Sequence, residues 1–275
     1  VVVGTSSEKA KNLMEELYKP FVRQGNPIIF MDEKSAELTK YAANSFLATK
    51  ITFMNEIANY CEIIGADVDK VRKGIGTDSR IGKRFLFPGI GYGGSCFPKD
   101  VKALNKSGID ENFQFKIINA VMDVNEIQKL ILVQKVKSYF GNDLKGKNFA
   151  LWGLAFKPET DDIREAPSLD IINELTLAGA NIVSYDPEAM PNVKKLIGDK
   201  IKYANSSLEA LKNVDALLIA TEWAAFRNPD FNEMNSLMKN PIIFDGRNLY
   251  SIESMKKRNF YYQSIGRQVV NKLLK

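Results

Sequence analysis

Short apolar segments alternate with helical segments from Lys145 onward, and this alternation constrains the fold more than any other feature of the sequence. The predicted strands are 149–156, 182–185, 216–221, 242–245 and 260–262, and the predicted helices are 168–178, 193–197, 208–212 and a short segment near Met255. Strands and helices that alternate at these lengths form a parallel sheet with helices on both faces. We therefore predict an α/β fold class, with a doubly wound parallel sheet over residues 144–275.

The residues before this sheet are predicted to be almost wholly helical. Ser35 is a good N-cap for a long helix that Gly65 ends. About thirty residues at ~1.5 Å each give a helix of about 45 Å, which suits a spine between domains and a dimer interface. The apolar positions of this helix have helical spacing: Leu38, Tyr41, Ala42, Phe46, Ile51, Met54, Ile57, Ala58, Cys61 and Ile64. Cys61 is one of them, so core packing is the better interpretation for it. With helices over 68–74 and 112–140, residues 32–143 form a predicted helical central domain.

The first 31 residues contain a strand end at 1–4, a helix over 6–18 and a short strand over 28–31. This order is that of the last part of a β–α domain whose earlier strands lie upstream. We therefore expect the chain to be a fragment of a longer protein, with residues 1–31 as the tail of its N-terminal domain.

Residues 89–100, with the sequence GIGYGGSCFPKD, combine four glycines, one of only two cysteines and a predicted helix start. Glycine permits positive φ angles and a close approach of the backbone to a ligand. Proline is favoured at the start of a helix, so Cys96 is expected just before an N-terminus, where the helix dipole and Lys99 favour a thiolate. The alternative is a buried hydrophobic cysteine beside a plain turn. The combination of residues favours a nucleophilic thiol.

The first turn of the predicted sheet, residues 153–158, lacks the G-x-G-x-x-G pattern, so a dinucleotide pyrophosphate is not expected there as in a Rossmann domain. Lys157 follows this strand and Arg247 follows a later one. Both therefore lie at the carboxyl edge, where open α/β sheets bind ligands. A lone cation at a strand end is usually only part of the surface. Two cationic residues at one edge, in a chain of net charge +5, favour a nucleotide diphosphate as the ligand.

Composition excludes several functional classes. The chain has no histidine, which removes Ser-His-Asp triads and most zinc dehydrogenase sites, and no metal site is predicted. No apolar run approaches the ~20 residues of a membrane span, and no basic cluster is dense enough to indicate nucleic acid, so neither a membrane nor a nucleic-acid partner is expected. Two cysteines make no disulfide framework, and a catalytic thiol implies a reducing compartment, which favours a cytoplasmic location.

Three segments carry a resemblance to a known family. Residues 93–100 (GGSCFPKD), 36–46 (AELTKYAANSF) and 156–168 (FKPETDDIREAPS) resemble signatures of the UDP-glucose 6-dehydrogenases, within the UDP-glucose/GDP-mannose dehydrogenase family. One departure is Asp161, where the third signature usually has glycine. The resemblance implies an NAD-binding Rossmann domain, a helical centre and a Rossmann-like nucleotide-sugar domain. The fingerprint for NAD and the family's catalytic glutamate would lie upstream of this chain.

The implied reaction is the NAD-dependent four-electron oxidation of UDP-glucose to UDP-glucuronate. The resemblance makes Cys96 the nucleophile that forms a thiohemiacetal and then a thioester. It assigns Lys40 and Asn44 to the oxyanion and Asp100 to the hydrolytic water. The implied UDP-sugar contacts are Phe87, Pro88, Gly89, Ile90, Gly91, Tyr92, Gly93, Phe156, Lys157 and Arg247, with Arg80 from the second subunit of a homodimer formed through the central helix. The implied NAD contacts are Phe97, Pro98, Lys99 and Arg164.

Two alternatives stay open from the sequence. A GDP-mannose 6-dehydrogenase, or one that acts on another nucleotide sugar, would carry similar signatures. The chain would otherwise be a catalytically silent module that binds a nucleotide sugar and dimerises. In either case we expect the chain to be inactive by itself, because its NAD-binding fingerprint is missing.

Overall fold

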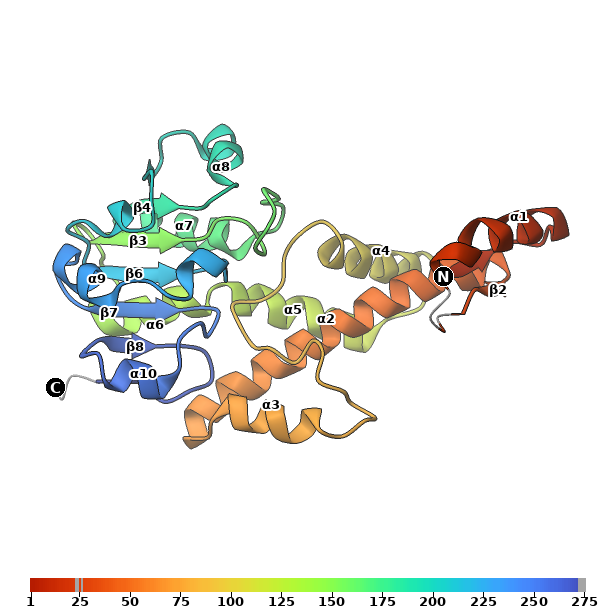
Figure 1. Ribbon diagram of the computed structural model, residues 1–275, viewed down its shortest axis with the longest axis horizontal. Coiled ribbons are helices and arrows are strands. Elements are labelled where there is room, and N and C mark those ends of the chain that lie inside the picture. Colours follow the sequence, from red (N-terminus) through yellow and green to blue (C-terminus); the bar gives the residue numbers. More distant parts are fainter. Residues whose placement is uncertain (23–24, 26, 272–275) are drawn as a thin grey trace.

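The computed structural model describes residues 1–22, 25 and 27–271. Within this part of the chain, six parallel strands form the larger sheet (Figure 1). Their spatial order is β5 (Lys202–Tyr203), β4 (Asn181–Tyr185), β3 (Asn148–Trp152), β6 (Ala216–Ile219), β7 (Ile242–Asp245) and β8 (Tyr261–Gln263). The strand order reverses between β3 and β6, and such a switch point opens a crevice for ligands at the carboxyl ends of the strands. The α/β fold class and the doubly wound parallel sheet are confirmed.

Alternating side chains bury both faces of this sheet. Phe149 and Leu151 of β3 point into one core, with α6 (Ile131–Phe140), α7 (Pro167–Leu177) and α8 (Met190–Ile197). Ala150 and Trp152 point into the other, with α9 (Phe231–Leu237), α10 (Ile252–Lys256) and the short 3₁₀ helices η2 (Glu209–Leu211) and η3 (Ala224–Phe226). Because side chains alternate with a period of two, a strand covered on both faces is apolar throughout.

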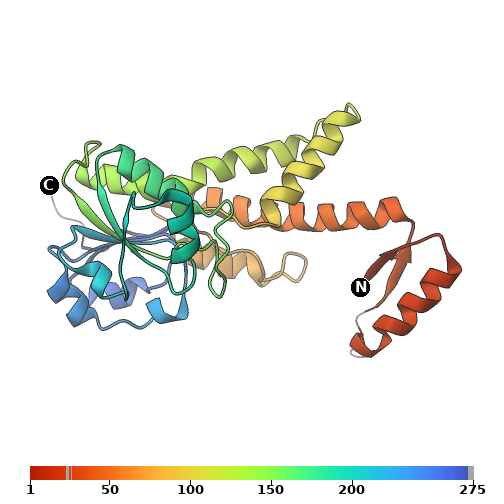
Figure 2. The same ribbon diagram turned by 90° about the horizontal axis from the view of Figure 1, so that it is seen from above.

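The helical part of the molecule is built on α2 (Glu33–Ile64), whose 32 residues span about 48 Å at ~1.5 Å per residue. It packs against α4 (Phe97–Asp110) and α5 (Lys116–Lys129), and α3 (Val68–Gly76) follows it after Gly65 in the left-handed conformation. The elements that precede α2 in the chain lie at its N-terminal end (Figure 2). They are β1 (Val2–Gly4), α1 (Glu8–Tyr18), η1 (Lys19–Phe21) and β2 (Ile29–Met31), and β1 and β2 pair in parallel. The start of α4 lies beside the first half of α2, where Asn44 contacts Asp100.

Several predicted bounds are wrong, each for a local reason. Asp32, not Ser35, caps α2, because its carboxylate accepts a hydrogen bond of 2.9 Å from the Ser35 N–H. The helix predicted over 112–140 is two helices, α5 and α6, since the helical hydrogen bonding is interrupted at Leu130. The first of these helices, α5, begins at Lys116 instead of residue 112, because Asn112 has a positive φ of 57° that does not fit a helix. The segment over 208–212 is a 3₁₀ helix, and β5 and α9 were not predicted.

One face of α2 is apolar and exposed. Leu38, Phe46 and Ile64 are among its exposed side chains, together with Phe53 and Tyr60. Cys61, in contrast, is only 2% exposed, which confirms its predicted core packing. In the described part of the chain, no helix combines the length and the apolar character that a membrane crossing requires. An apolar face of this extent is typical of a surface that another protein surface covers.

Candidate active site

Packing of α4 on α2 brings the four predicted catalytic residues together. Lys40 and Asn44 lie one turn apart on α2, and Lys40 Nζ donates to Asn44 Oδ1 at 3.4 Å. Asn44 Nδ2 donates to Asp100 Oδ2 on α4 at 2.5 Å. Cys96 is the exposed N-cap of α4, and its carbonyl oxygen accepts from the Asp100 N–H at 2.9 Å. The start of α4 thus gathers a thiol, a carboxylate, an amide and an ammonium group.

Asp100 is held in its ionised form although it is only 2% exposed. Burial raises its pKa, but hydrogen bonds from Lys99 and Asn44, with the charge of Lys40, outweigh burial and keep the pKa below its ordinary value. Lys99 Nζ lies 3.0 Å from Asp100 Oδ1. An ionised carboxylate one turn from an exposed thiol can orient a water molecule or accept a proton from it.

The two cysteines lie in contrasting surroundings. Cys96 is exposed at a helix N-terminus, close enough to Lys99 and Arg164 to interact with their positive charges. Cys61 is buried, and this burial raises the pKa of its thiol. Thiols that react as nucleophiles are found in exposed, electropositive places of the first kind.

The glycine-rich loop, residues 89–94, leads directly into α4. Gly91 and Gly94 have φ angles of 86° and 84°, which L side chains rarely adopt. A Cβ on Gly94 would lie 2.6 Å from the ring of Phe156, and a Cβ on Gly93 would overlap the Glu165 carbonyl oxygen. The loop therefore needs glycine in order to pack against the segment after β3. Burial, with the charges of two nearby glutamates, raises the pKa of Tyr92 to about 12, so its phenol stays neutral at neutral pH.

A buried aspartate holds the turn that carries Lys157. Asp186 follows β4 and accepts hydrogen bonds from the N–H groups of Leu154 and Ala155 at 2.6 and 3.1 Å. These bonds fix the turn after β3 without a G-x-G-x-x-G sequence. Lys157 projects from this turn, exposed, with its ammonium group 5.3 Å from the centre of the Phe156 ring.

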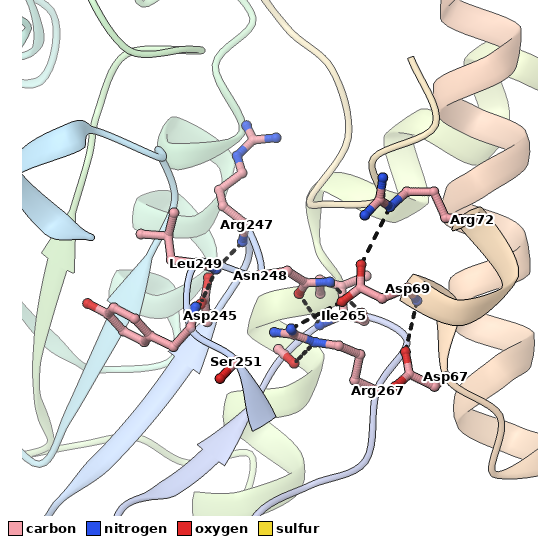
Figure 3. A network of polar contacts seen from close by, with 12 residues as sticks. Asp67, Asp69, Arg72, Asp245, Arg247, Asn248, Leu249, Ser251, Ile265 and Arg267 are labelled. Carbon is pink, nitrogen blue, oxygen red and sulfur yellow. Dashed lines mark hydrogen bonds and ion pairs between the residues drawn. The ribbon is translucent and has the colours of Figure 1, made fainter. Parts of the chain in front are cut away.

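A second buried aspartate holds the loop that carries Arg247. Asp245 ends β7, and its carboxylate accepts from the N–H groups of Arg247 and Leu249 at 2.9 and 2.7 Å (Figure 3). The Arg247 guanidinium lies 3.3 Å from Glu222 and donates to the Gly91 carbonyl oxygen at 3.4 Å. Arg247 thus reaches from the sheet to the glycine-rich loop.

A pocket of about 900 Å³ lies where this loop meets the edge of the sheet. This volume is in the range of small-molecule and cofactor sites. Gly89 and Ile90 do not line it, since both are buried within the loop. The wall includes eight of the residues predicted as UDP-sugar contacts: Phe87, Pro88, Gly91, Tyr92, Gly93, Phe156, Lys157 and Arg247. It also includes Phe97, which was predicted as an NAD contact.

Further cations in the pocket wall were missed by the sequence analysis: Arg72, Lys73, Arg84, Arg227 and Arg267. Asp69 pairs with Arg72 of the same helix at 3.5 Å and with Arg267 at 3.4 Å, and the second pair ties α3 to the segment after β8 (Figure 3). Arg72 also lies over the ring of Phe87, 4.3 Å from its centre. Apart from the net positive charge, no sequence signal marks these residues, because they come from segments far apart in the chain. Their summed charge favours an anionic ligand.

The pocket wall does not include the predicted catalytic residues Lys40, Asn44, Cys96 and Asp100, nor Pro98 and Lys99 at the start of α4. Arg80 and Arg164 also lie outside it. Arg80 is exposed and pairs with Asp78 at 2.5 Å, so its place in a partner's site stays a prediction. Arg164 pairs with Asp162 at 2.8 Å and lines a second pocket of about 500 Å³ together with Lys195. The hydrogen bond from Arg164 lowers the pKa of Asp162.

Comparison with known proteins gives matches over most of the chain. A model of the UDP-glucose/GDP-mannose dehydrogenase family, central domain, matches residues 34–127, and a model of that family's UDP binding domain matches residues 150–252. The UDP-glucose 6-dehydrogenase TuaD of Bacillus subtilis is 46% identical over 98% of this chain and 58% of its own length. The UDP-glucose 6-dehydrogenase of Pseudomonas aeruginosa is 43% identical over 97% of this chain and 60% of its own length.

A solved structure is also similar. The UDP-glucose dehydrogenase of Pyrobaculum islandicum aligns with a TM-score of 0.86 and 32% identity, over 97% of this chain and 58% of that one. The chain therefore spans about 60% of the length of the relatives that it matches.

Proposed function

The chain belongs to the UDP-glucose/GDP-mannose dehydrogenase family, and from this we propose that the protein containing it oxidises UDP-glucose to UDP-glucuronate. The observation that carries the proposal is the hydrogen-bonded group Lys40–Asn44–Asp100 beside the exposed thiol of Cys96. It combines a nucleophile, donors for an oxyanion and an ionised carboxylate at the start of one helix.

The nucleotide would lie in the 900 Å³ pocket. Lys157 and Arg247 would bind the diphosphate, since charge-assisted contacts at the carboxyl edge of an open α/β sheet suit phosphate groups. The match of the UDP binding domain to residues 150–252 supports this placement. The sugar would extend along the glycine-rich loop toward Cys96, because that loop leads into α4.

The side chains around Cys96 fit a two-step oxidation of carbon 6. Two molecules of NAD, bound one after the other, would each accept one hydride, the first as the alcohol becomes an aldehyde and the second as the thiohemiacetal becomes a thioester, and each hydroxyl proton would leave to solvent. The Cys96 thiolate adds to the aldehyde carbon, and Lys40 and Asn44 donate hydrogen bonds to the oxygen that gains charge. Asp100 accepts a proton from the water that attacks the thioester, and the carbon–sulfur bond breaks to return the thiolate.

Exposed groups beside Cys96 fit the anionic parts of NAD. The side chains of Lys99 and Arg164 are 72% and 68% exposed. Phe97 and Pro98 form the first turn of α4, and N–H groups at a helix N-terminus favour anions. Lys99 and Arg164 would hold the cofactor there against the start of α4.

A homodimer through α2 completes the proposal. The exposed face with Phe46, Phe53 and Tyr60 would be covered by a second copy, and Arg80 would reach into that copy's pocket. Residues 1–31, 32–143 and 144–275 would then be the tail of the NAD domain, the dimerisation domain and the UDP-sugar domain. Since the chain spans about 60% of its relatives, we propose that by itself it binds the nucleotide sugar without oxidising it.

The test is Cys96→Ser in the protein that contains this chain, with NADH absorbance, product analysis and calorimetry. The variant should bind UDP-glucose as tightly as the unmodified protein but form no UDP-glucuronate. Cys61→Ala, at the buried cysteine, should retain the activity. Glucuronate formation by Cys96→Ser at the unmodified rate would contradict the covalent step, and tighter binding of GDP-mannose than of UDP-glucose would identify another substrate.

A further inference from the structure

Three side-chain amides lie directly under the glycine-rich loop. Asn125 Oδ1 accepts a hydrogen bond from the Tyr92 N–H at 2.9 Å, and Asn125 Nδ2 donates to the Tyr92 carbonyl oxygen at 3.1 Å. Asn55 Oδ1 accepts from the Gly89 N–H at 2.8 Å, and Gln128 Nε2 donates to the Gly89 carbonyl oxygen at 2.6 Å. Both polar groups of Gly89 and of Tyr92 are therefore bound by amides from α2 and α5.

We propose that Asn55, Asn125 and Gln128 are positioning residues that set the backbone of this loop for nucleotide-sugar binding, an inference that rests on the proposed function. The three side chains are 0%, 3% and 1% exposed, and the pocket wall does not include them. Gly91, Tyr92 and Gly93 of the loop do line the pocket. The amides thus act on a ligand only through the loop.

The chemistry of an amide suits this position. We call Asn55, Asn125 and Gln128 the clamp. Asn125 has both a donor and an acceptor and satisfies the two polar groups of Tyr92 without charge, whereas Asn55 and Gln128 each satisfy one polar group of Gly89. A buried carboxylate would leave a carbonyl oxygen facing a negative charge, and an ammonium group would leave an N–H without an acceptor. Asn59 Nδ2 donates to Gln128 Oε1 at 2.8 Å, so the orientation of Gln128 is itself fixed.

The clamp also controls Arg247, the proposed diphosphate ligand. The Gly91 carbonyl oxygen, between the two clamped residues, accepts from Arg247 Nη1 at 3.4 Å. A Cβ on Gly91 would lie 2.9 Å from Asn125 Oδ1, so the loop sits tightly on this amide. A shift of the loop would therefore move the contacts of the guanidinium group as well as the pocket wall.

The test replaces each donor by a group that donates only when protonated. In Asn125→Asp and Gln128→Glu, an ionised carboxylate faces the carbonyl oxygen of Tyr92 or Gly89, whereas a protonated one donates to it as the amide does. Burial raises the pKa of such a carboxyl above its ordinary value of about 4. We expect UDP affinity at pH 8 to be about tenfold weaker than in the unmodified chain, as for one lost buried hydrogen bond, and to return toward it at pH 5.

The ratio of the affinities of the altered and unmodified chains at each pH removes the pH dependence that the two chains share. α2 contributes the amides Asn55 and Asn59, and charged groups on other elements near the loop include Lys102, Glu126, Lys129, Lys157, Glu165, Asp170, Glu222 and Arg247. Asn119→Asp on α5 and Gln134→Glu on α6 are matched controls outside the clamp and should bind UDP as the unmodified chain does.

Two measurements decide the inference. Unchanged UDP affinity of both variants at pH 8, or a deficit that persists fully at pH 5, would overturn it. If the unmodified chain binds no UDP, the proposed function fails, and hydrogen exchange of the backbone amides 89–94 at pH 8 decides the clamp separately. Faster exchange in both variants than in the controls would support it, and equal exchange would overturn it.

Discussion

The Asn44 amide donates a hydrogen bond of 2.5 Å to the Asp100 carboxylate, although the two residues are 56 positions apart. This bond joins α2 to α4 at the point where the exposed thiol of Cys96 begins α4. It is also one of the contacts that hold the pKa of Asp100 low despite its burial. The same contact therefore contributes to folding and prepares the carboxylate for the proposed hydrolysis.

Asn44→Leu should lower the free energy of unfolding at pH 7 by about 1.5–3 kcal/mol, the usual contribution of a hydrogen bond to a charged group. Because the folded-state pKa of Asp100 is depressed, this stability is present above the ordinary Asp pKa of about 3.9 and is lost as the pH falls through the lower folded value. Urea unfolding at pH 7 and below pH 4 measures the difference.

Asp110→Asn is the control for this prediction, since Asp110 lies on the same helix but its side chain is 58% exposed, paired with Lys106. Its effect should stay below about 1 kcal/mol. A loss in Asn44→Leu that does not diminish in acid would contradict the role given to the Asp100 charge.

Gly94→Ala should impair both folding and UDP binding, whereas Gly141→Ala should impair folding alone. Both glycines have positive φ, a strained backbone conformation that costs an alanine about 1–3 kcal/mol. Only at Gly94 would the new methyl group also meet an aromatic ring, that of Phe156 in the pocket wall. Calorimetry with UDP and urea unfolding of both variants separate the two effects, and equal UDP affinities would argue against the packing of this ring on the loop.

Lys157→Ala should weaken UDP binding about tenfold or more with little loss of stability, since a charge-assisted contact contributes on the order of 1.5–3 kcal/mol. Lys157 is exposed, so the folded chain does not depend on it. Arg247→Ala should weaken UDP binding similarly but also destabilise the chain, because Arg247 pairs with Glu222 and contacts the glycine-rich loop. Lys145→Ala, at an exposed lysine before β3, is the control. If neither variant changes the affinity, the diphosphate lies elsewhere.

Iodoacetamide should modify Cys96 well before Cys61. Cys96 is exposed at a helix N-terminus, whereas Cys61 is 2% exposed and burial raises the pKa of its thiol, so it forms less thiolate at any pH near neutrality. Mass mapping of the labelled peptides against time gives the order. Labelling under denaturing conditions, where both thiols should react, is the control, and a reversed order in the folded chain would remove the case for an accessible nucleophile.

Features with a local signal could be predicted from the sequence. The glycines and Pro98 placed Cys96 at a helix start, and the strand ends placed Lys157 and Arg247 at one edge of the sheet. Arg267 and Asp69 carry no such signal, because they are single charged residues 198 positions apart that only tertiary packing brings together. Asp32 and Ser35 are both good N-caps, and the sequence does not tell which of them begins the helix.

The roles of Asn125 and Gln128 were equally invisible in the sequence. Asn and Gln on a helix are usually exposed, so the sequence alone does not indicate that these two bind a loop. The family resemblance supplied Lys40, Asn44 and Asp100, and the structure supplied the hydrogen bonds that join Lys40 to Asn44 and Asn44 to Asp100.

The 275-residue chain should bind UDP-glucose by itself but should form no NADH when NAD is added. The proposed nucleotide pocket is built entirely from residues of this chain, so binding needs nothing further. Hydride transfer instead needs the nicotinamide held about 3–3.5 Å from carbon 6. Lys99 and Arg164 are exposed single cations and provide no rigid cradle of backbone N–H groups for a pyrophosphate.

Calorimetry with UDP-glucose and NADH absorbance, measured on one sample, check this prediction. Lys157→Ala is the matched control, because it should lose the heat of binding while the NADH reading stays at the baseline. Binding with no NADH would place the nucleotide-sugar site and the hydride acceptor in separable parts of the longer protein. Turnover at the rate of a complete dehydrogenase would mean that Lys99, Arg164 and the start of α4 hold NAD without any other cradle.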